Sequence, residues 1–203
     1  MAGQLGKKVE RIAWGITGSA DQMLETYSVM VNIKERTGIE PMVFVSKEGE
    51  TVMKWYRLWD KIQKDFPDFK VETGPNSPFV AGPLQMGHYD FLLIAPATAN
   101  TVAKIVCGIA DTLVTNAVSQ TAKGETPIFI LPADRRRGTV KALAPSGKTF
   151  SLNMRKVDVE NSEKLATMEN ITVLESAYDI YDIVGIERPA PEDPQKVLAQ
   201  NGD

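Results

Sequence analysis

Three short stretches of small and polar residues, each directly after an apolar run, contain the groups in this sequence best suited to bind a ligand. Hydroxyl and amide side chains donate and accept hydrogen bonds, and small residues let a ligand approach the backbone closely. If each stretch also opens a helix, free backbone N–H groups there attract an anion such as a phosphate. The stretches are Gly18-Ser19-Ala20, Ser46 and Thr98-Ala99-Asn100-Thr101.

The same residues also fit an ordinary structural role. Ser46 and Thr98 are residue types that commonly cap a helix N-terminus, and Ser19-x-x-Gln22 has the spacing of a capping box. The first stretch lacks the GxGxxG and GxxxxGK(S/T) patterns, so neither a dinucleotide fingerprint nor a P-loop is indicated. Residue types alone therefore leave phosphate binding and helix capping open.

Strand-like and helix-like segments alternate along the chain and would place the three stretches together. This alternation predicts a three-layer α/β/α sandwich around a parallel sheet, flavodoxin-like or Rossmann-like. Ligands bind beyond the carboxyl ends of strands in such sheets, so the stretches should meet at one sheet edge. The predicted strands lie at 11–16, 41–45, 91–94, 127–131 and 171–174.

Other segments carry weaker signals. The residues Val52, Trp55, Tyr56 and Trp59 have helical spacing and predict one helix with its aromatic rings in the core. Cys107 should be a small buried residue.

Glycines and prolines break up 66–87 and predict a long loop that serves as a lid or subunit contact. A loop is also predicted for 135–156, which holds seven basic and no acidic residues. We expect one domain over 1–184 and a disordered tail over 185–203.

Composition narrows the class of protein. A chain of 203 residues with 43% hydrophobic and 24% charged residues is typical of one globular domain. A net charge of −3 argues against a general nucleic-acid binder, and a single cysteine excludes an intrachain disulfide. Because we see no signal core and no apolar run near the roughly 18 residues of a spanning helix, we expect a cytoplasmic protein without a membrane segment.

The sequence APATANT at 95–101, followed by AKI and GIADTLVTNA, resembles the motif of the flavoprotein family of homo-oligomeric flavin-containing cysteine decarboxylases. The resemblance spans roughly Val9 to Val184 and is strongest to the archaeoflavoprotein and dihydromethanopterin-reductase branch. It implies bound FMN and an oligomer built on trimers. It also implies that the three polar stretches bind the flavin, with Gly18 and Ser19 at the phosphate, Ser46 at the phosphate or ribityl chain, and Asn100 at the flavin ring.

Two departures from the family pattern argue against decarboxylation. The decarboxylases carry a catalytic histidine about eight residues before the aspartate that opens the third strand, but counting back from Asp90 reaches Gly82. The only histidine, His88, is expected to be partly buried and structural. Where the decarboxylases have a Pro-Ala-Met-Asn substrate clamp, this chain has Pro132-Ala133-Asp134-Arg135.

The expected function is therefore electron transfer through FMN, from a ferredoxin-like or pyridine-nucleotide donor to a pterin or another acceptor. FMN is expected rather than FAD because no glycine fingerprint for a pyrophosphate is present. The alternatives are a flavin-dependent decarboxylase, a flavin prenyltransferase or a non-catalytic flavin-binding protein. Arg135, Arg136 and Arg137 follow a predicted strand and should form a positive rim that attracts an acidic redox protein such as a ferredoxin, unless they belong to a solvated loop.

Overall fold

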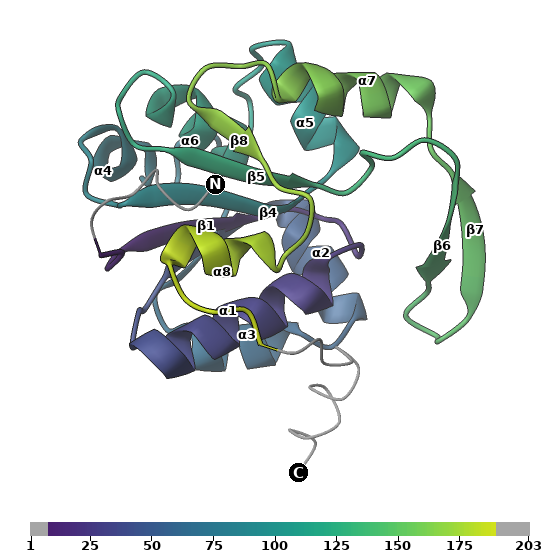
Figure 1. The fold of residues 1–203 in the computed structure, drawn as a ribbon, viewed down its shortest axis with the longest axis horizontal. Helices are drawn as coiled ribbons and strands as arrows, with labels where there is room; N and C mark the ends of the chain where they lie inside the picture. Colours follow the sequence, from purple (N-terminus) through teal and green to yellow (C-terminus); the bar gives the residue numbers. More distant parts are fainter. Residues whose placement is uncertain (1–7, 190–203) are drawn as a thin grey trace.

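The sheet at the centre of the molecule has six parallel strands in the order β3-β2-β1-β4-β5-β8 (Figure 1). The computed structural model describes residues 8–189, apart from the side chain of Leu143. Counted along the sheet's own strands, this is the 3-2-1-4-5-6 order of a doubly wound α/β fold. The predicted three-layer parallel sandwich is confirmed, and the strand order is the Rossmann-like one.

The strands of the main sheet are β1 Ile12–Ile16, β2 Met42–Val45, β3 Phe69–Val71, β4 Phe91–Ala97, β5 Ile128–Pro132 and β8 Ile171–Val173. A separate antiparallel pair consists of β6 Thr139–Leu143 and β7 Thr149–Asn153. The helices are α1 Met23–Thr37, α2 Lys47–Trp55, α3 Trp59–Asp65, α4 Ala81–Gln85, α5 Ala99–Val106, α6 Leu113–Thr121, α7 Lys156–Leu165 and α8 Asp179–Val184. None of the described helices is long and apolar enough to cross a membrane.

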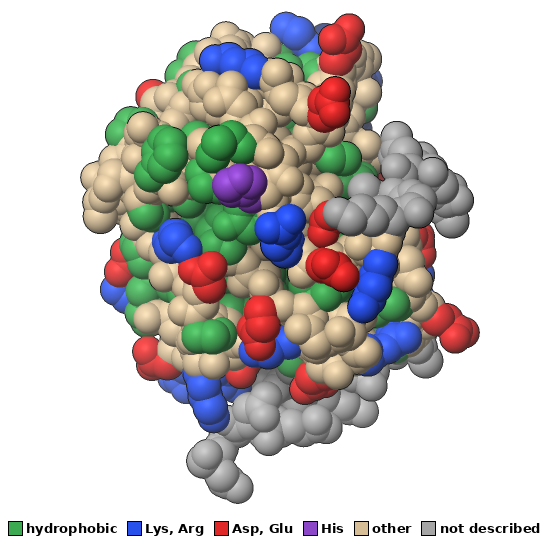
Figure 2. All heavy atoms as spheres, turned by 90° about the vertical axis from the view of Figure 1, so that its left-hand side faces the viewer, with side chains coloured by type: hydrophobic (Ala, Val, Ile, Leu, Met, Phe, Trp, Pro, Cys, Tyr) green, Lys and Arg blue, Asp and Glu red, His purple; other side chains and the backbone are tan. Residues whose placement is uncertain are grey.

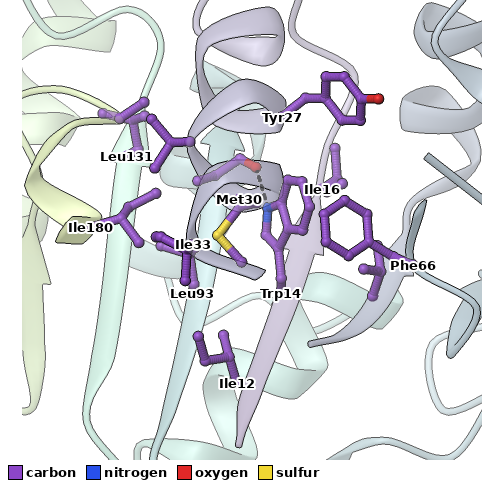
Figure 3. Packing of buried hydrophobic residues seen from close by; sticks show 14 of the residues in the cluster. Ile12, Trp14, Ile16, Tyr27, Met30, Ile33, Phe66, Leu93, Leu131 and Ile180 are labelled. Carbon is purple, nitrogen blue, oxygen red and sulfur yellow. Dashed lines mark hydrogen bonds between the residues drawn. The ribbon is translucent and has the colours of Figure 1, made fainter. Parts of the chain in front are cut away.

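Each face of the sheet has its own hydrophobic core, because the central strands are buried on both sides. Helices α1, α2, α3 and α8 contribute to the core on one face, and α4, α5, α6 and α7 to the core on the other. Trp14 anchors the first core: its indole Nε1 donates a hydrogen bond to Ala95 O at 2.7 Å, and its ring meets Phe66 edge-on (Figure 3). This bond satisfies the one polar group of a fully buried side chain.

The long loop predicted at 66–87 is wrong in part, because it contains two regular elements. Strand β3 forms one edge of the sheet, and α4 packs on the second core through Leu84. The basic loop predicted at 135–156 is also wrong in part, because most of it forms the β6–β7 hairpin. The elements in both segments are short and lie close to glycines and prolines in the sequence, so the sequence pattern indicated loops.

The single helix predicted across the aromatic stripe is wrong. Helix α2 ends at Trp55, and Arg57 adopts a left-handed conformation with φ 57° before α3 begins. Trp55 is 62% exposed, whereas Met53 and Leu58 are fully buried. Val52, Tyr56 and Trp59 are partly buried and pack against the first core, as predicted, so the stripe fails only at Trp55 and in its continuity as one helix.

Cys107 and His88 are both exposed, and the predictions that they would be buried are wrong. Cys107 ends α5, and His88 lies in the turn that precedes β4. At the other end of the chain, Arg188 forms ion pairs with Asp179 and Asp182 of α8. Residues 190–203 of the predicted tail lie outside the described residues.

Candidate functional site

The candidate site lies at the carboxyl edge of the sheet, between β1 and β4. These strands are neighbours, but the chain leaves β1 for α1 on one face and β4 for α5 on the other. Such a reversal opens a crevice beyond the strand ends, and ligands of doubly wound folds bind there. The structure thus places the first and third predicted stretches at the ends of two neighbouring strands, on either side of the point where such a crevice is expected.

Thr17 joins the two sides. Its hydroxyl donates to Pro96 O at 2.9 Å and accepts from the Thr98 backbone N–H at 2.8 Å. The side chain is buried, so both bonds are shielded from water. Sequence reasoning did not assign a role to Thr17, although a polar residue at the end of an apolar strand was the available signal.

The loop after β1 offers hydrogen-bond donors that the protein itself does not use. The predicted Ser19 capping box is absent: α1 begins at Met23, and its N-cap residue Gln22 adopts φ 62° without a side-chain cap bond. Within residues 8–189, the backbone N–H groups of Ala20 and Asp21 have no hydrogen-bond partner. In the same described range, the Ser19 hydroxyl makes only a long contact of 3.4 Å to Asp21 O. This loop can therefore bind an anion.

Gly18 allows this loop to approach the start of α2. A Cβ atom at Gly18 would lie 2.8 Å from the Glu48 Cβ atom and 2.9 Å from the Glu48 carbonyl. Because backbone cannot move aside easily, any side chain at this position would push the two loops apart. The absence of a side chain here is thus a geometric requirement of the site.

Ser46 directly follows β2 and caps α2, which is one of its two predicted roles. Its hydroxyl oxygen accepts from the Gly49 N–H at 3.0 Å, and its own backbone N–H donates to Ile16 O at 3.0 Å. The second bond fixes Ser46 beside the end of β1. The hydroxyl hydrogen is not needed for capping and can donate to a ligand.

Thr98, the N-cap of α5, accepts from the Thr101 N–H at 3.1 Å. Ala99 and Asn100 form the first turn of this helix, where backbone N–H groups lack intrahelical partners. The Asn100 side chain is exposed, and no hydrogen bond to it is found among the described residues. Its amide is therefore available to donate to and accept from a ligand.

Glu72 is a site-bordering residue that sequence reasoning missed. Its buried carboxylate accepts from the Lys47 N–H at 3.1 Å and from the Leu113 N–H at 2.8 Å, which are the first residues of α2 and α6. A negative charge at a helix N-terminus is stabilising. Because this carboxylate already occupies both helix ends, the loops after β1 and β4 remain as the places for a ligand's phosphate.

Two carboxyl groups at this edge, those of Asp134 and Asp21, have raised pKa values. Desolvation raises the pKa of Asp134, and the negative charges of Asp158 and Asp21 raise it further. Desolvation also raises the pKa of Asp21, although hydrogen bonds from Gln22 and the charge of Arg135 oppose it. A carboxyl group with a raised pKa at a ligand crevice is suited to hold a proton.

The basic run after β5 is less positive than its sequence indicates. Arg135 is largely buried in an ion pair with Glu175, and Arg136 lies 3.6 Å from the same carboxylate. Arg137 lies 3.8 Å from Glu163. The Arg136 and Arg137 side chains nevertheless remain about 70% exposed, so they can meet a partner.

Comparison with known proteins gives the family. The Flavoprotein family matches residues 4–198. This chain belongs to the Flavoprotein family. An uncharacterized protein of Methanocaldococcus jannaschii is 46% identical, with 86% of this chain and 94% of the relative covered. The dihydromethanopterin reductase (acceptor) of the same organism is 29% identical over 87% of this chain and 96% of its own.

A solved structure supports the fold. Burkholderia xenovorans DmrB in complex with FMN, described as a cubic protein cage for redox transfer, superposes with a TM-score of 0.71. It is 26% identical, and the match covers 88% of this chain and 95% of that one.

Proposed function

We propose that this flavoprotein binds FMN in the crevice between β1 and β4 and transfers electrons from a ferredoxin-like or pyridine-nucleotide donor to a pterin or another acceptor. The observation that carries the proposal is the Thr17 bridge, which holds two donor-rich loops at the point where the strand order reverses. Relatives described as dihydromethanopterin reductase and as an FMN complex for redox transfer support it.

The residues of the crevice fit FMN. Ser19 and the unpartnered Ala20 and Asp21 amides would hold the phosphate, with the Ser46 hydroxyl beside them. The first turn of α5 would line the other side, and its Asn100 amide would hydrogen-bond the flavin ring. One anion-binding loop without a glycine fingerprint suits a single phosphate, which favours FMN over FAD.

FMN supplies the redox chemistry, and the protein supplies position and electrostatics. The Thr17 bridge and the close contact at Gly18 fix the walls of the crevice. Asp134, at the carboxyl end of β5, is held beside the end of β4 by the Ala133 N–H bond to Ala97 O at 2.9 Å. We assign Asp134 the role of holding a proton at its carboxyl oxygen for an acceptor that gains electrons and protons together.

The donor's docking place is proposed at Arg136 and Arg137, which are exposed at the same sheet edge. Arg135 takes no direct part, because Glu175 pairs with it. An acidic donor protein would gain mainly in association rate from this positive charge. We further propose that the protein is a homo-oligomer built on trimers, as the family resemblance implies and as the cage formed by DmrB supports.

Decarboxylation is disfavoured by the position of the only histidine. His88 lies just before the amino end of β4, whereas the crevice lies beyond its carboxyl end. Arg135 also stands where the decarboxylases carry the clamp asparagine. A non-catalytic flavin carrier is the remaining alternative, and it differs from the proposal only in turnover.

Two measurements test the proposal. Flavin released from the purified protein by heat should run as FMN on chromatography, and FAD or the absence of flavin would refute the site. The yellow protein should then be reduced anaerobically by a ferredoxin or a pyridine nucleotide and reoxidised by a dihydropterin. If bound FMN is reduced by no donor, or returns its electrons only to oxygen, the carrier alternative holds.

A further inference from the structure

The β6–β7 hairpin projects from the body of the molecule as a two-stranded ribbon (Figure 1). The two strands pair with each other and join no other sheet among residues 8–189. A two-stranded hairpin is at best marginally stable in water, and it needs packing against something else to become firmly ordered. We therefore expect the ribbon to pack on another surface.

One face of the ribbon is apolar. Val140 lies opposite Leu152, and Ala142 lies opposite Phe150, so these four side chains share a face. Val140, Phe150 and Leu152 are 38%, 43% and 43% exposed. The other face carries the polar cross-strand pairs Thr139–Asn153 and Lys141–Ser151. An amphipathic ribbon of this kind has a specific side to bury.

A second exposed apolar patch lies at the opposite end of the sheet, around α4. Phe79 and Met86, which flank this helix, are 62% and 65% exposed, and the Phe79 ring covers Gly82. Figure 2 shows hydrophobic side chains gathered around His88, which follows α4 closely. This patch precedes the amino end of β4, whereas the ribbon follows the carboxyl end of β5. The two apolar surfaces thus face in different directions and cannot cover each other within one chain.

Charge favours another copy of the same chain as the partner. The ribbon, 139–153, contains Lys141 and Lys148 and no acidic residue, so its formal charge is +2. The whole chain sums to −3, so the rest of the chain carries −5. A basic, apolar ribbon is therefore complementary to the acidic remainder of a second copy.

We propose that the ribbon of one copy packs its apolar face on the α4 patch, Phe79 and Met86, of the next copy. A contact between two different surfaces is head-to-tail, and repeated by rotation it closes a ring. This inference rests on the homo-oligomer of the proposed function, for which it supplies the contact surfaces. It also explains why an exposed ribbon keeps three large apolar side chains.

The test compares the two faces of the ribbon by light scattering after size exclusion. The double variant Phe150→Asp with Leu152→Asp should dissociate the oligomer to monomer. The matched control, Thr149→Asp with Ser151→Asp, adds the same charge to the polar face and should keep the native mass. Met86→Asp, on the other surface, should also give monomer.

Mixing distinguishes the head-to-tail contact from a symmetric one. A mixture of the ribbon variant and the Met86→Asp protein retains one intact ribbon and one intact patch, so it should form heterodimers. If the ribbon instead pairs with a ribbon, the Met86→Asp protein keeps its native mass, and the proposal is overturned. A wild-type monomer, or an unchanged mass in the ribbon variant, overturns it equally.

Flavin content separates this inference from the proposed function. Circular dichroism verifies that each variant is folded. If the Phe150→Asp, Leu152→Asp variant unfolds, the variant Phe150→Ser with Leu152→Ser is used in its place. Monomeric variants that still retain FMN after dilution would show that the FMN site does not require the oligomeric ring. If the ribbon variant keeps its mass but loses reduction by an acidic donor protein, the ribbon docks the donor instead.

Discussion

Thr17 connects the two loops of the crevice through a single hydroxyl, so its removal should affect both stability and flavin binding. Thr17→Val keeps the shape but leaves the Thr98 N–H without its partner. An unpaired buried donor costs about 1–3 kcal/mol. We expect that loss in urea unfolding of the apoprotein, together with faster flavin release.

Thr26→Val is the matched control for this substitution. The Thr26 hydroxyl is buried and finds no hydrogen-bond partner among the described residues, so its removal should be neutral or stabilising. Equal losses in the two variants would mean that the Thr17 bridge contributes nothing specific.

Asp134 should make stability depend on pH in the opposite sense to an ion-paired aspartate. Its folded-state pKa is raised, mainly by desolvation, so ionisation costs folding energy. That cost is absent below the unfolded pKa and grows as pH rises through the folded pKa. Asp134→Asn should therefore raise Tm at pH 7, and the gain should vanish near pH 3.

Asp182→Asn should change Tm in the opposite direction in the same assay. Its hydrogen bond with Arg188 lowers the pKa of Asp182, so the wild-type carboxylate stabilises the fold above its unfolded pKa. This substitution should lower Tm at pH 7 or leave it unchanged. A Tm decrease for Asp134→Asn would contradict the desolvated carboxyl described above.

Among the elements, α2 and α6 depend on one carboxylate from the edge strand β3. Glu72→Gln replaces one acceptor oxygen by a donor, so either the Lys47 or the Leu113 N–H loses its partner, and both helix ends lose a favourable charge. We expect a loss of about 1–3 kcal/mol in urea unfolding and weaker FMN binding, because α2 carries the Ser46 turn. Exposed Glu125→Gln should change stability by less than about 0.5 kcal/mol, and an equal effect would deny Glu72 this role.

The elements also show what could be predicted from sequence. Long apolar runs such as β4 and the alternation of strands with helices were sufficient for the layers and for the shared edge of Ser46 and Thr98. β3 was missed because a three-residue edge strand with Lys70 at its centre leaves no apolar run. The aromatic stripe indicated the core-facing Tyr56 and Trp59 but not the end of α2, because helical spacing does not reveal the left-handed turn at Arg57.

The site was predicted less completely than the fold, because it depends on contacts between distant segments. Thr17 meets Thr98 across 81 positions, and Glu72 meets Leu113 across 41. Similarly, Ser19-x-x-Gln22 has the spacing of a capping box, but Gln22 adopts a left-handed conformation and α1 begins only at Met23. Such pairings follow from strand order rather than from local sequence.

At the scale of the whole molecule, charge at the carboxyl edge should govern the reaction with an acidic donor protein. Arg136→Glu with Arg137→Glu should slow reduction about tenfold or more at low salt, because steering of this kind raises association rates by at least that factor. Added salt should slow the wild-type reaction, since exposed charges are screened within about 8 Å at 0.15 M.

Lys64→Glu with Lys123→Glu makes the same change in charge at the amino edge, just before β3 and β5. This control should leave the donor rate nearly unchanged and should keep its FMN. If both double variants slow reduction equally, only net charge matters, and the arginine rim is not the docking place.

The Thr17 bridge has one further consequence, because it joins protein atoms only. The width of the crevice is thus set before any cofactor arrives, and binding requires little ordering of the chain. In such a preorganised apoprotein, one bound flavin can be exchanged for another. Flavin analogues of different reduction potential should enter it without refolding, which would allow the driving force of electron transfer to be varied while the polypeptide stays the same.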